Sequence, residues 1–479
     1  IVEAGAVLVG DAVPEPAGVA APIWKLSALT SAVLPAPPPV AHTPDDVAEV
    51  IFTSGATSEP KGVVLTHRNI LANVIPIERE IGKYKKYARP FLPIRFLNLL
   101  PLSHMFGQAM ATFVPPLLGG VVVFNRTFAP EEIVTQIRTR RISVLVSVPK
   151  ILEVLRDYVT QTLPETRVPP PGRSHWMARW WRYRRAHRAF GLKFWAMVVG
   201  AAPLDPDVEA FWGRLGFVVV QGYGLTETAP IVTLNHPFKT SKGSVGTPIE
   251  GVEVRIAEDG EILVRGENVT SGYYDGSGLS AHDSGHGGLP PESRIPNPES
   301  RVLDTEGWLH TGDIGERDAQ GRLFIKGRKK EMIVTPDGLN VFPEDVERVL
   351  DAQEGVRESA VVGVVDGNEE RVHAVLVLAP NVDPNVVIRR TNRQLQDHQR
   401  VRTSSVWPTS ELPRTEGTRK LKRRAIRDWV QAGDSTPLTG AADTFEALVG
   451  RFTHGRAVGG STTLDELGLS SLERVELMV

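Results

Sequence analysis

The stretch TSGATSEPKGVVLTH, from Thr53 to His67, has the residue types of a phosphate-binding loop. Gly55 lets backbone N–H groups approach anionic oxygens, and Lys61 adds a positive charge. Because Lys61 precedes Gly62 and no hydroxyl follows the lysine, the stretch departs from the G-x-x-x-x-G-K-[ST] pattern of P-loop nucleotidases. An ordinary surface turn is the alternative interpretation of the loop taken alone. The hydroxyl-bearing residues within it are Thr53, Ser54, Thr57 and Ser58.

A second stretch, QGYGLTETAP, directly follows a run typical of a buried strand. At the end of a strand, the ring of Tyr223 could stack on a purine. The carboxylate of Glu227 could hold Mg²⁺ through oxygen, with Gly224 and Thr226 beside it. Taken alone, such a pair of residues is more often part of a solvated loop.

Three further stretches contain charged residues suited to a nucleotide. In GWLHTGDIG, the carboxylate of Asp313 could accept hydrogen bonds from both ribose hydroxyls. In GRKKEMIV, Arg328 lies near that ribose position, and Lys330 is a plausible hinge. In LPRTEGTRKLKRRAI, Lys420 lies in a basic, turn-rich segment, which alone would be read as a charged face.

The elements around these stretches predict an α/β fold. ISVLVSVP followed by KILEVLRDYV, and DPDVEAFWGRL followed by GFVVVQGYG, alternate strand and helix patterns as in βα units with a largely parallel sheet. VEVRIAEDGEILVRG predicts a hairpin that turns at Asp259-Gly260. The polar stretch DGSGLSAHDSGHGGLPPESRIPNPES, which follows Tyr274, predicts a disordered or mobile surface insertion.

Composition narrows the class of protein. With 479 residues the chain is long enough for two or more domains, and a net charge of −2 gives no general affinity for nucleic acid. The chain has no cysteine, so thioester chemistry would need a thiol carried by a cofactor. We find no apolar run long enough to span a membrane, and a cytoplasmic protein is the default expectation. The chain begins and stops within patterns, so we expect a fragment of a longer gene product.

One segment, RSHWMARWWRYRRAHRAFGLKFW, places aromatic residues on one helical face and arginines on the other. A helix that binds a membrane surface or a partner is one interpretation. A helix that covers its own domain is the favoured one, because Gly191 breaks the pattern. The aromatic face comprises Trp176, Trp180, Tyr183, His187, Phe190 and Phe194.

In their combination and order these motifs resemble the adenylate-forming superfamily of acyl-CoA synthetases, luciferases and peptide-synthetase adenylation domains. The resemblance covers about residues 46–430. It implies a large adenylation domain of parallel βα sheets with a small β-barrel-like part, truncated at its N-terminus, and a small mobile α+β subdomain. The expected ranges are a remnant or linker at 1–45, the large domain at 46–326, the subdomain at 327–430, a linker at 431–443, and the start of a helical carrier domain at 444–479.

The resemblance also implies roles for the residues above. The loop from Thr53 to Lys61 would hold the ATP phosphates, and Thr53 and Glu227 would hold Mg²⁺. Gly200, Ala201 and Ala202 would border the adenine that stacks on Tyr223. Asp313 and Arg328 would fix the ribose. Lys420 would reach the α-phosphate and the substrate carboxylate until the small domain rotates about Lys330 for the second step, the attack by a thiol.

The acid and the thiol are predicted from two further positions. His104, in LPLSHMFGQ, stands where acyl- and aryl-CoA ligases have a histidine and amino-acid-activating relatives have Phe-Asp, which argues against an amino acid. TTLDELGLSSLERVELMV resembles the start of an acyl carrier protein, with Ser471 as the serine that carries phosphopantetheine. We therefore expect a medium- or long-chain fatty acid to be transferred to CoA or to the carrier in cis, with a downstream acyltransferase and peripheral membrane contact as further possibilities. An amino-acid adenylation module and a silent nucleotide-binding scaffold are the alternatives.

Overall fold

The computed structural model describes residues 6–11, 14–16, 19, 21–31, 41–53, 61–83, 92–125, 127–169, 181–236, 241–274, 302–335, 339–366, 369–415 and 420–432. The predicted surface insertion, the loop residues 54–60 and the predicted carrier segment with Ser471 lie outside these residues.

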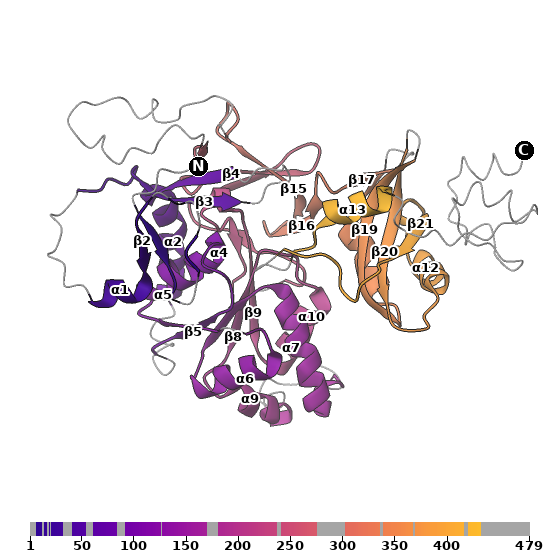
Figure 1. The fold of residues 1–479 in the computed structure, drawn as a ribbon, viewed down its shortest axis with the longest axis horizontal. Coiled ribbons are helices and arrows are strands. Elements are labelled where there is room, and N and C mark those ends of the chain that lie inside the picture. Colours follow the sequence, from indigo (N-terminus) through magenta and orange to yellow (C-terminus); the bar gives the residue numbers. More distant parts are fainter. Residues whose placement is uncertain are drawn as a thin grey trace, which may run out of the picture.

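A seven-stranded sheet forms the centre of the larger part of the molecule (Figure 1). Five of its strands run parallel, as the alternation of strand and helix patterns predicts, and the two short strands at one edge are antiparallel. The order is β11 (Thr247–Pro248), β10 (Thr233–Leu234), β9 (Val218–Tyr223), β8 (Ala196–Val199), β7 (Val144–Ser147), β5 (Arg95–Asn98) and β6 (Val121–Phe124).

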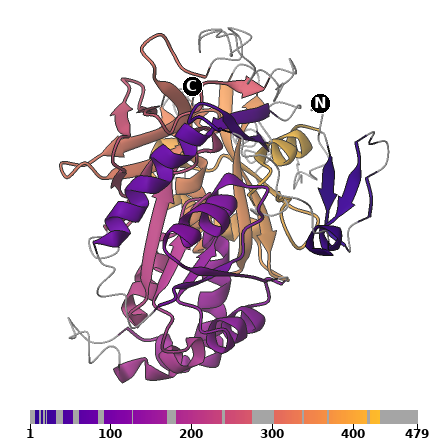
Figure 2. The same cartoon turned by 90° about the vertical axis from the view of Figure 1, so that its left-hand side faces the viewer.

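Helices pack on both faces of this sheet. Because parallel strands need crossover connections, the helices between them alternate with the strands. One group packs together on one face: α6 (Pro130–Thr139), α7 (Pro149–Thr162), α9 (Arg184–Phe190) and α10 (Pro206–Leu215). The other group comprises α2 (His67–Gly82), α4 (Met105–Gln108), the π-helix η2 (Ala109–Phe113) and α5 (Val114–Leu117). Figure 2 shows α2, in violet, as the long helix of this second group.

The predicted aromatic helix covers its own domain in the residues that the structure describes. Tyr183, His187, Phe190 and Phe194 are buried, and His187 Nε2 lies 2.9 Å from the carbonyl oxygen of Leu215. The helix α9 ends where Gly191 takes a φ of 88°. Trp176 and Trp180 lie outside the described residues.

Two smaller sheets complete the large lobe, which we define as the elements from β3 to β16. In one, β4 (Lys61–Thr66) lies between β3 (Val47–Thr53) and β14 (Tyr273–Tyr274). The other is an antiparallel sheet in the order β12 (Glu253–Ile256), β13 (Glu261–Arg265), β15 (Leu309–Arg317) and β16 (Leu323–Arg328). The turn between β12 and β13 falls at Asp259-Gly260, as predicted.

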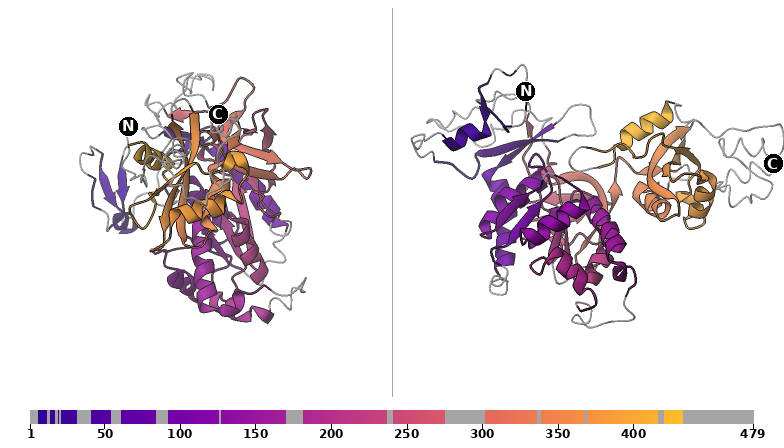
Figure 3. Two further views of the ribbon diagram at one scale, coloured as in Figure 1. Left: turned by 90° about the vertical axis from the view of Figure 1, so that its right-hand side faces the viewer. Right: turned by 60° about the horizontal axis from the view of Figure 1, so that its bottom comes forward.

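The small lobe, from β17 to α13, is α+β. It contains a pair of strands, β17 (Ile333–Val334) and β18 (Asn340–Val341), and a sheet of β19 (Val356–Asp366), β20 (Glu369–Leu378) and β21 (Thr403–Val406). Its helices are α11 (Pro343–Asp351), α12 (Pro384–Asn392) and α13 (Arg423–Gln431). Apolar clusters on both sides of the sheet give this lobe its own core. Figure 3 shows the ribbon of this lobe, in orange and yellow, from two further sides.

A separate pair of parallel strands, β1 (Val7–Val9) and β2 (Ile23–Lys25), precedes α1 (Leu26–Ser31) near the N-terminus. These elements lie within the stretch that the sequence predicted as a remnant or linker. The strands pair in parallel register, with Val7 opposite Ile23 and Leu8 opposite Trp24.

Candidate active site

A cleft of about 3330 Å³ is lined by both lobes. It brings together every predicted site residue that the structure describes. From the large lobe these are Thr53, Lys61, His104, Gly200, Ala201, Ala202, Tyr223, Gly224, Thr226, Glu227, Asp313 and Arg328, and from the small lobe Lys420. Ser54, Gly55, Thr57, Ser58 and Ser471 lie outside the described residues. The chemical roles assigned to all of these residues stay predictions.

The ends of parallel strands place the first group. Gly200 to Ala202 follow the last residue of β8, and Tyr223 is the last residue of β9, so both loops leave the carboxyl edge of the sheet. Ligands of open α/β sheets bind at that edge. Ala201 has a φ of 68°, in the left-handed region, and a Cβ on Gly224 would lie 1.7 Å from the carbonyl oxygen of Pro230. The backbone of both loops is therefore tightly constrained.

Asp313 is the most enclosed charged group of the cleft, with 4% of its surface exposed. The hydroxyl of Tyr223 donates to its Oδ2 at 2.8 Å, and the Nε of Arg328 lies 3.1 Å from its Oδ1. Asp313 and Arg328 face each other because they are register partners on β15 and β16. Burial raises the pKa of Asp313, although Arg328 and Tyr223 act in the opposite direction. Burial and the neighbouring Asp313 carboxylate raise the pKa of Tyr223 well above its ordinary value.

A second polar group surrounds Glu227. The hydroxyl of Tyr273 donates to Glu227 Oε1 at 2.9 Å, and the Nζ of Lys61 lies 5.1 Å from the centroid of the Tyr273 ring. Burial and the Glu227 carboxylate raise the pKa of Tyr273. Thr53 pairs with Lys61 across β3 and β4, and its hydroxyl donates to the Lys61 carbonyl at 3.4 Å. Lys61, Tyr273 and Glu227 thus form a second polar cluster that lines the cleft.

Lys420 is the contribution of the small lobe. Its backbone N–H donates to Thr415 Oγ1 at 3.0 Å, and its carbonyl accepts from the Thr415 N–H at 2.8 Å, so two hydrogen bonds to Thr415 hold its backbone. The surrounding protein and the charge of Arg328 lower its pKa, against the opposite effect of Asp313. Burial, followed by the Lys420 charge, lowers the pKa of His104. Lys420 therefore lies within electrostatic range of both His104 and the pair Asp313–Arg328.

Sequence reasoning missed two residues of this region. The sequence gives no signal for Tyr273, because its partner Glu227 lies far away in the chain. Only the pairing of β14 with β4 brings the two residues together. The basic segment around Arg423 predicts an exposed, charged helix face. The Arg423 side chain is instead largely buried and binds Glu331, Glu344 and Glu347. The position of Arg423 at the start of a helix with the apolar residue Ile426 one turn later was the available signal.

The oxygen atoms that Glu227 and Thr53 offer as metal ligands suit a magnesium ion that is bound mainly by phosphates. Among the described residues no group of three or more acidic or histidine side chains could form a protein-only metal site. Mg²⁺ in nucleotide sites usually takes one or two carboxylates and completes its shell with phosphate oxygens and water. Glu227, which uses Oε1 for Tyr273, and the hydroxyl of Thr53 fit this pattern.

The comparisons with known proteins identify the family of this chain. The model of the family described as AMP-binding enzyme matches residues 3–274. A curated relative from Mycobacterium tuberculosis, 3-[(3aS,4S,7aS)-7a-methyl-1,5-dioxo-octahydro-1H-inden-4-yl]propanoyl:CoA ligase, is 31% identical over 81% of this chain and 67% of its own length. Long-chain-fatty-acid--CoA ligase of Escherichia coli O157:H7 is 27% identical over 80% of this chain and 62% of its own length.

Among solved structures, ATP-bound MatB from Rhodopseudomonas palustris superposes with a TM-score of 0.66 at 26% identity, over 85% of this chain and 74% of that chain. The chain belongs to the AMP-binding enzyme family, and its α/β fold is that of the family's solved members. It spans 67% and 56% of the first two curated relatives. Among the described residues, no helix has the length and apolar character needed to cross a membrane.

Proposed function

We propose that this chain activates an apolar carboxylic acid with ATP, as acyl-AMP, and then transfers the acyl group to the thiol of CoA or of a carrier-bound phosphopantetheine. The observation that carries the proposal is the convergence of Lys420, from the small lobe, with Asp313 and Arg328 of the large lobe in one cleft. Such a cleft places the polar groups of the large lobe beside a cation that could meet a second anion.

The chemistry requires two anions to approach each other. A carboxylate oxygen attacks the α-phosphorus of ATP, the bond from that phosphorus to the bridging oxygen breaks, and pyrophosphate leaves. Asp313 would accept hydrogen bonds from the ribose, while Lys420 would lie between the carboxylate and the α-phosphate. Mg²⁺ held at Glu227 and Thr53 would supply further neutralisation of phosphate charge. Fixed charges of this kind lower the barrier because they are oriented before the reaction begins.

The wall of the cleft beyond the polar groups supports an apolar acid. Phe96, Val144, Val198 and Val220 of the central sheet line the same cleft as Met110 and Val114 from the opposite helices. His104 stands beside this wall, at the residue before α4. Burial lowers the pKa of His104, so its ring is neutral at neutral pH. A histidine at this position cannot supply the negative charge that would pair with a substrate ammonium.

The relatives support acid–CoA ligation but differ in the acid that their names give. These names specify an octahydroindenyl propanoate, ferulate, sulfoacetate and long-chain fatty acids. A medium- or long-chain fatty acid is our proposal for this chain, because the apolar wall extends over both the sheet and the facing helices. Ser471 remains the proposed attachment point for phosphopantetheine.

The test is ATP–pyrophosphate exchange with fatty acids of increasing length, aryl acids and amino acids, followed by thioester formation with CoA. We expect exchange with fatty acids and a fall of about 100-fold or more in Lys420→Ala, because a charge that acts in the transition state is lost. Arg424→Ala is the matched control, since Arg424 is an exposed cation four residues away on α13.

Exchange supported only by amino acids would overturn the proposed substrate class. If the folded protein shows no exchange with any acid, the proposed enzymatic activity is overturned and a nucleotide-binding scaffold is favoured. Comparison of CoA with a phosphopantetheinylated chain and its Ser471→Ala variant would identify the acceptor thiol.

A further inference from the structure

The chain passes from the core of the large lobe to that of the small lobe through one short segment. Leu323 and Ile325 on β16 still pack in the large lobe, whereas Ile333 belongs to the core of the small lobe. Between them, the N–H groups of Glu331 and Met332 both donate to the Arg328 carbonyl at 3.0 Å and form a tight turn. The position of Lys420 relative to Asp313 therefore depends on the geometry of residues 328–332.

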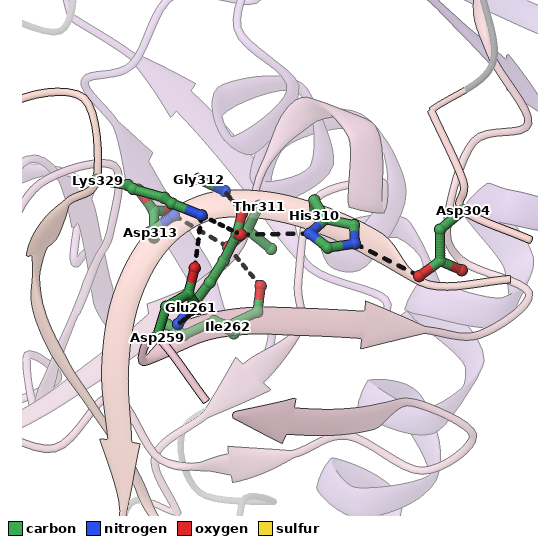
Figure 4. A network of polar contacts seen from close by, with 9 residues as sticks. All are labelled: Asp259, Glu261, Ile262, Asp304, His310, Thr311, Gly312, Asp313 and Lys329. Carbon is green, nitrogen blue, oxygen red and sulfur yellow. Dashed lines mark hydrogen bonds and ion pairs between the residues drawn. The ribbon is translucent and has the colours of Figure 1, made fainter. Parts of the chain in front are cut away.

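Lys329, on one side of this turn, is fixed to the large lobe (Figure 4). Its Nζ lies 2.7 Å from Asp259 Oδ2 and 2.9 Å from Glu261 Oε2, and its backbone N–H donates to the Gly312 carbonyl at 2.9 Å. Both carboxylates belong to the hairpin between β12 and β13. The two pairs raise the pKa of Lys329, so the ammonium stays charged at neutral pH.

Glu261 is a rigid anchor for this lysine. Its side chain is only 7% exposed, and its Oε1 accepts from the Gly312 N–H at 2.9 Å. Its Oε2 also lies 3.2 Å from Nδ1 of His310, whose other ring nitrogen lies 3.4 Å from Asp304 (Figure 4). An ordinary exposed ion pair contributes little because both side chains are free to move. Here one partner is nearly buried and held by further groups.

Glu331, on the other side of the turn, is fixed to the small lobe. Its Oε2 accepts from Nε of Arg423 at 2.9 Å, and Arg423 also binds Glu344 and Glu347 on α11. Lys330 lies between these two ionic clusters. Its side chain is exposed and has no hydrogen-bond or ion-pair partner among the described residues.

We propose that Lys329 is a positioning residue: together with Asp259 and Glu261 it confines motion between the lobes to Lys330 and so holds Lys420 toward Asp313. A chain anchored to one body at residue 329 and to another at residue 331 has a single free residue at which to turn. The consequence for catalysis rests on the proposed function, whereas the consequence for the orientation of the lobes does not.

The direct test measures the orientation of the lobes. Because the chain has no cysteine, Gln161→Cys on α7 and Glu354→Cys in the small lobe can be spin-labelled specifically. We expect the distribution of label distances to be clearly broader in Lys329→Met than in the parent. Lys329→Arg should restore most of the narrow distribution. Lys326→Met is the matched control, since Lys326 on the same strand forms an ion pair with Glu316 at 2.9 Å within the large lobe.

The kinetic test follows the first half-reaction by ATP–pyrophosphate exchange. We expect Lys329→Met to lower kcat for pyrophosphate exchange about 5- to 10-fold with little change in KM for ATP, because the nucleotide groups stay in place while Lys420 is positioned less often. Lys329→Arg should recover most of the rate, and urea unfolding should show that all variants remain folded.

An unchanged distance distribution in Lys329→Met would overturn the inference, whatever the activity. A broadened distribution in a protein that shows no exchange with any acid would leave the inference standing and overturn the proposed function. The two failures are thus separable.

Discussion

The hydroxyl of Tyr223 donates a 2.8 Å hydrogen bond to Asp313 and so ties the end of β9 to β15, 90 residues later in the chain. The bond fixes a nearly buried carboxylate whose other oxygen faces Arg328. The central sheet and the antiparallel sheet thereby share one polar contact at the cleft.

Tyr223→Phe should weaken nucleotide binding without unfolding the protein. A hydrogen bond to a charged group contributes about 1.5–3 kcal/mol, so we expect KM for ATP to rise about 10-fold or more. Tyr158→Phe on α7 is the control, because among the described residues its hydroxyl has no hydrogen-bond partner. An unchanged KM for ATP in Tyr223→Phe would show that Arg328 alone orients Asp313.

Gly224→Ala should be severely destabilising. An added Cβ would lie 1.7 Å from the Pro230 carbonyl oxygen, so the backbone of the loop would have to move. We expect a loss of about 3 kcal/mol or more in the free energy of unfolding, measured with urea. Gly213→Ala within α10 is the counterpart: a Cβ there meets no atom within 4 Å. That variant should gain up to about 1 kcal/mol from helix propensity, and equal stability of the two variants would contradict the prediction.

Arg423→Met should destabilise the small lobe, and its effect should depend on pH. Removal of one partner from a buried ionic cluster costs about 3–5 kcal/mol, because Glu344 and Glu347 would remain without their cation. Burial already raises the pKa of Glu344. In the variant the folded state would bind protons that the unfolded state releases, so its stability should rise as the pH falls toward about 5. Urea unfolding at several pH values tests this; a constant difference from the parent would argue against buried, unpaired carboxylates.

His373, on β20, should make the small lobe sensitive to acid. Its ring nitrogens lie 2.6 Å from Thr403 Oγ1 and 3.1 Å from Ser405 Oγ, and burial lowers its pKa to about 4. The unfolded chain takes up a proton near pH 6.5, so stability is full above that pH and is lost as the pH falls toward 4.

We expect His373 to account for about 2 kcal/mol between pH 7.5 and pH 5. Over this interval, the free energy of unfolding of His373→Asn should fall by about 2 kcal/mol less than that of the parent. His42→Asn, at an exposed histidine, should behave like the parent. An equal loss in the parent and in His373→Asn would assign the acid sensitivity to other groups.

Local patterns were enough to predict much of the fold. The helix α10 begins at Pro206 and places Val208, Phe211 and Leu215 on one buried face, and the turn at Asp259-Gly260 has a sequence typical of hairpins. The prediction that the Trp/Arg-rich segment covers its own domain is confirmed for the part of the segment that the structure describes. Such features depend on residues within a few positions of one another.

The polar contacts that bind distant segments were not predictable in this way. No residue near Tyr273 in the sequence indicates that its hydroxyl binds Glu227. In the sequence, Lys329 is one of several cations in GRKKEM, and only the β12–β13 hairpin of the fold places two carboxylates beside it. Arg423 differs from its exposed neighbour Arg424 only by the face of α13 that it occupies. These contacts depend on strand register and on which face of a helix is buried.

The position of β4 between β3 and β14 has a consequence for synthesis on the ribosome. Asn69, at the start of α2, donates to the carbonyls of Glu267 and Val269, and the hydroxyl of Thr270 donates to the Val64 carbonyl. The hairpin of β3 and β4 thus lacks its third strand and these donors and acceptors until about 200 more residues have left the exit tunnel, as their separations of 198, 200 and 206 positions show. Sequence-distant pairing of this kind forms late. The nascent chain must therefore keep Val63 and Leu65, which end fully buried, from associating with other chains during that interval.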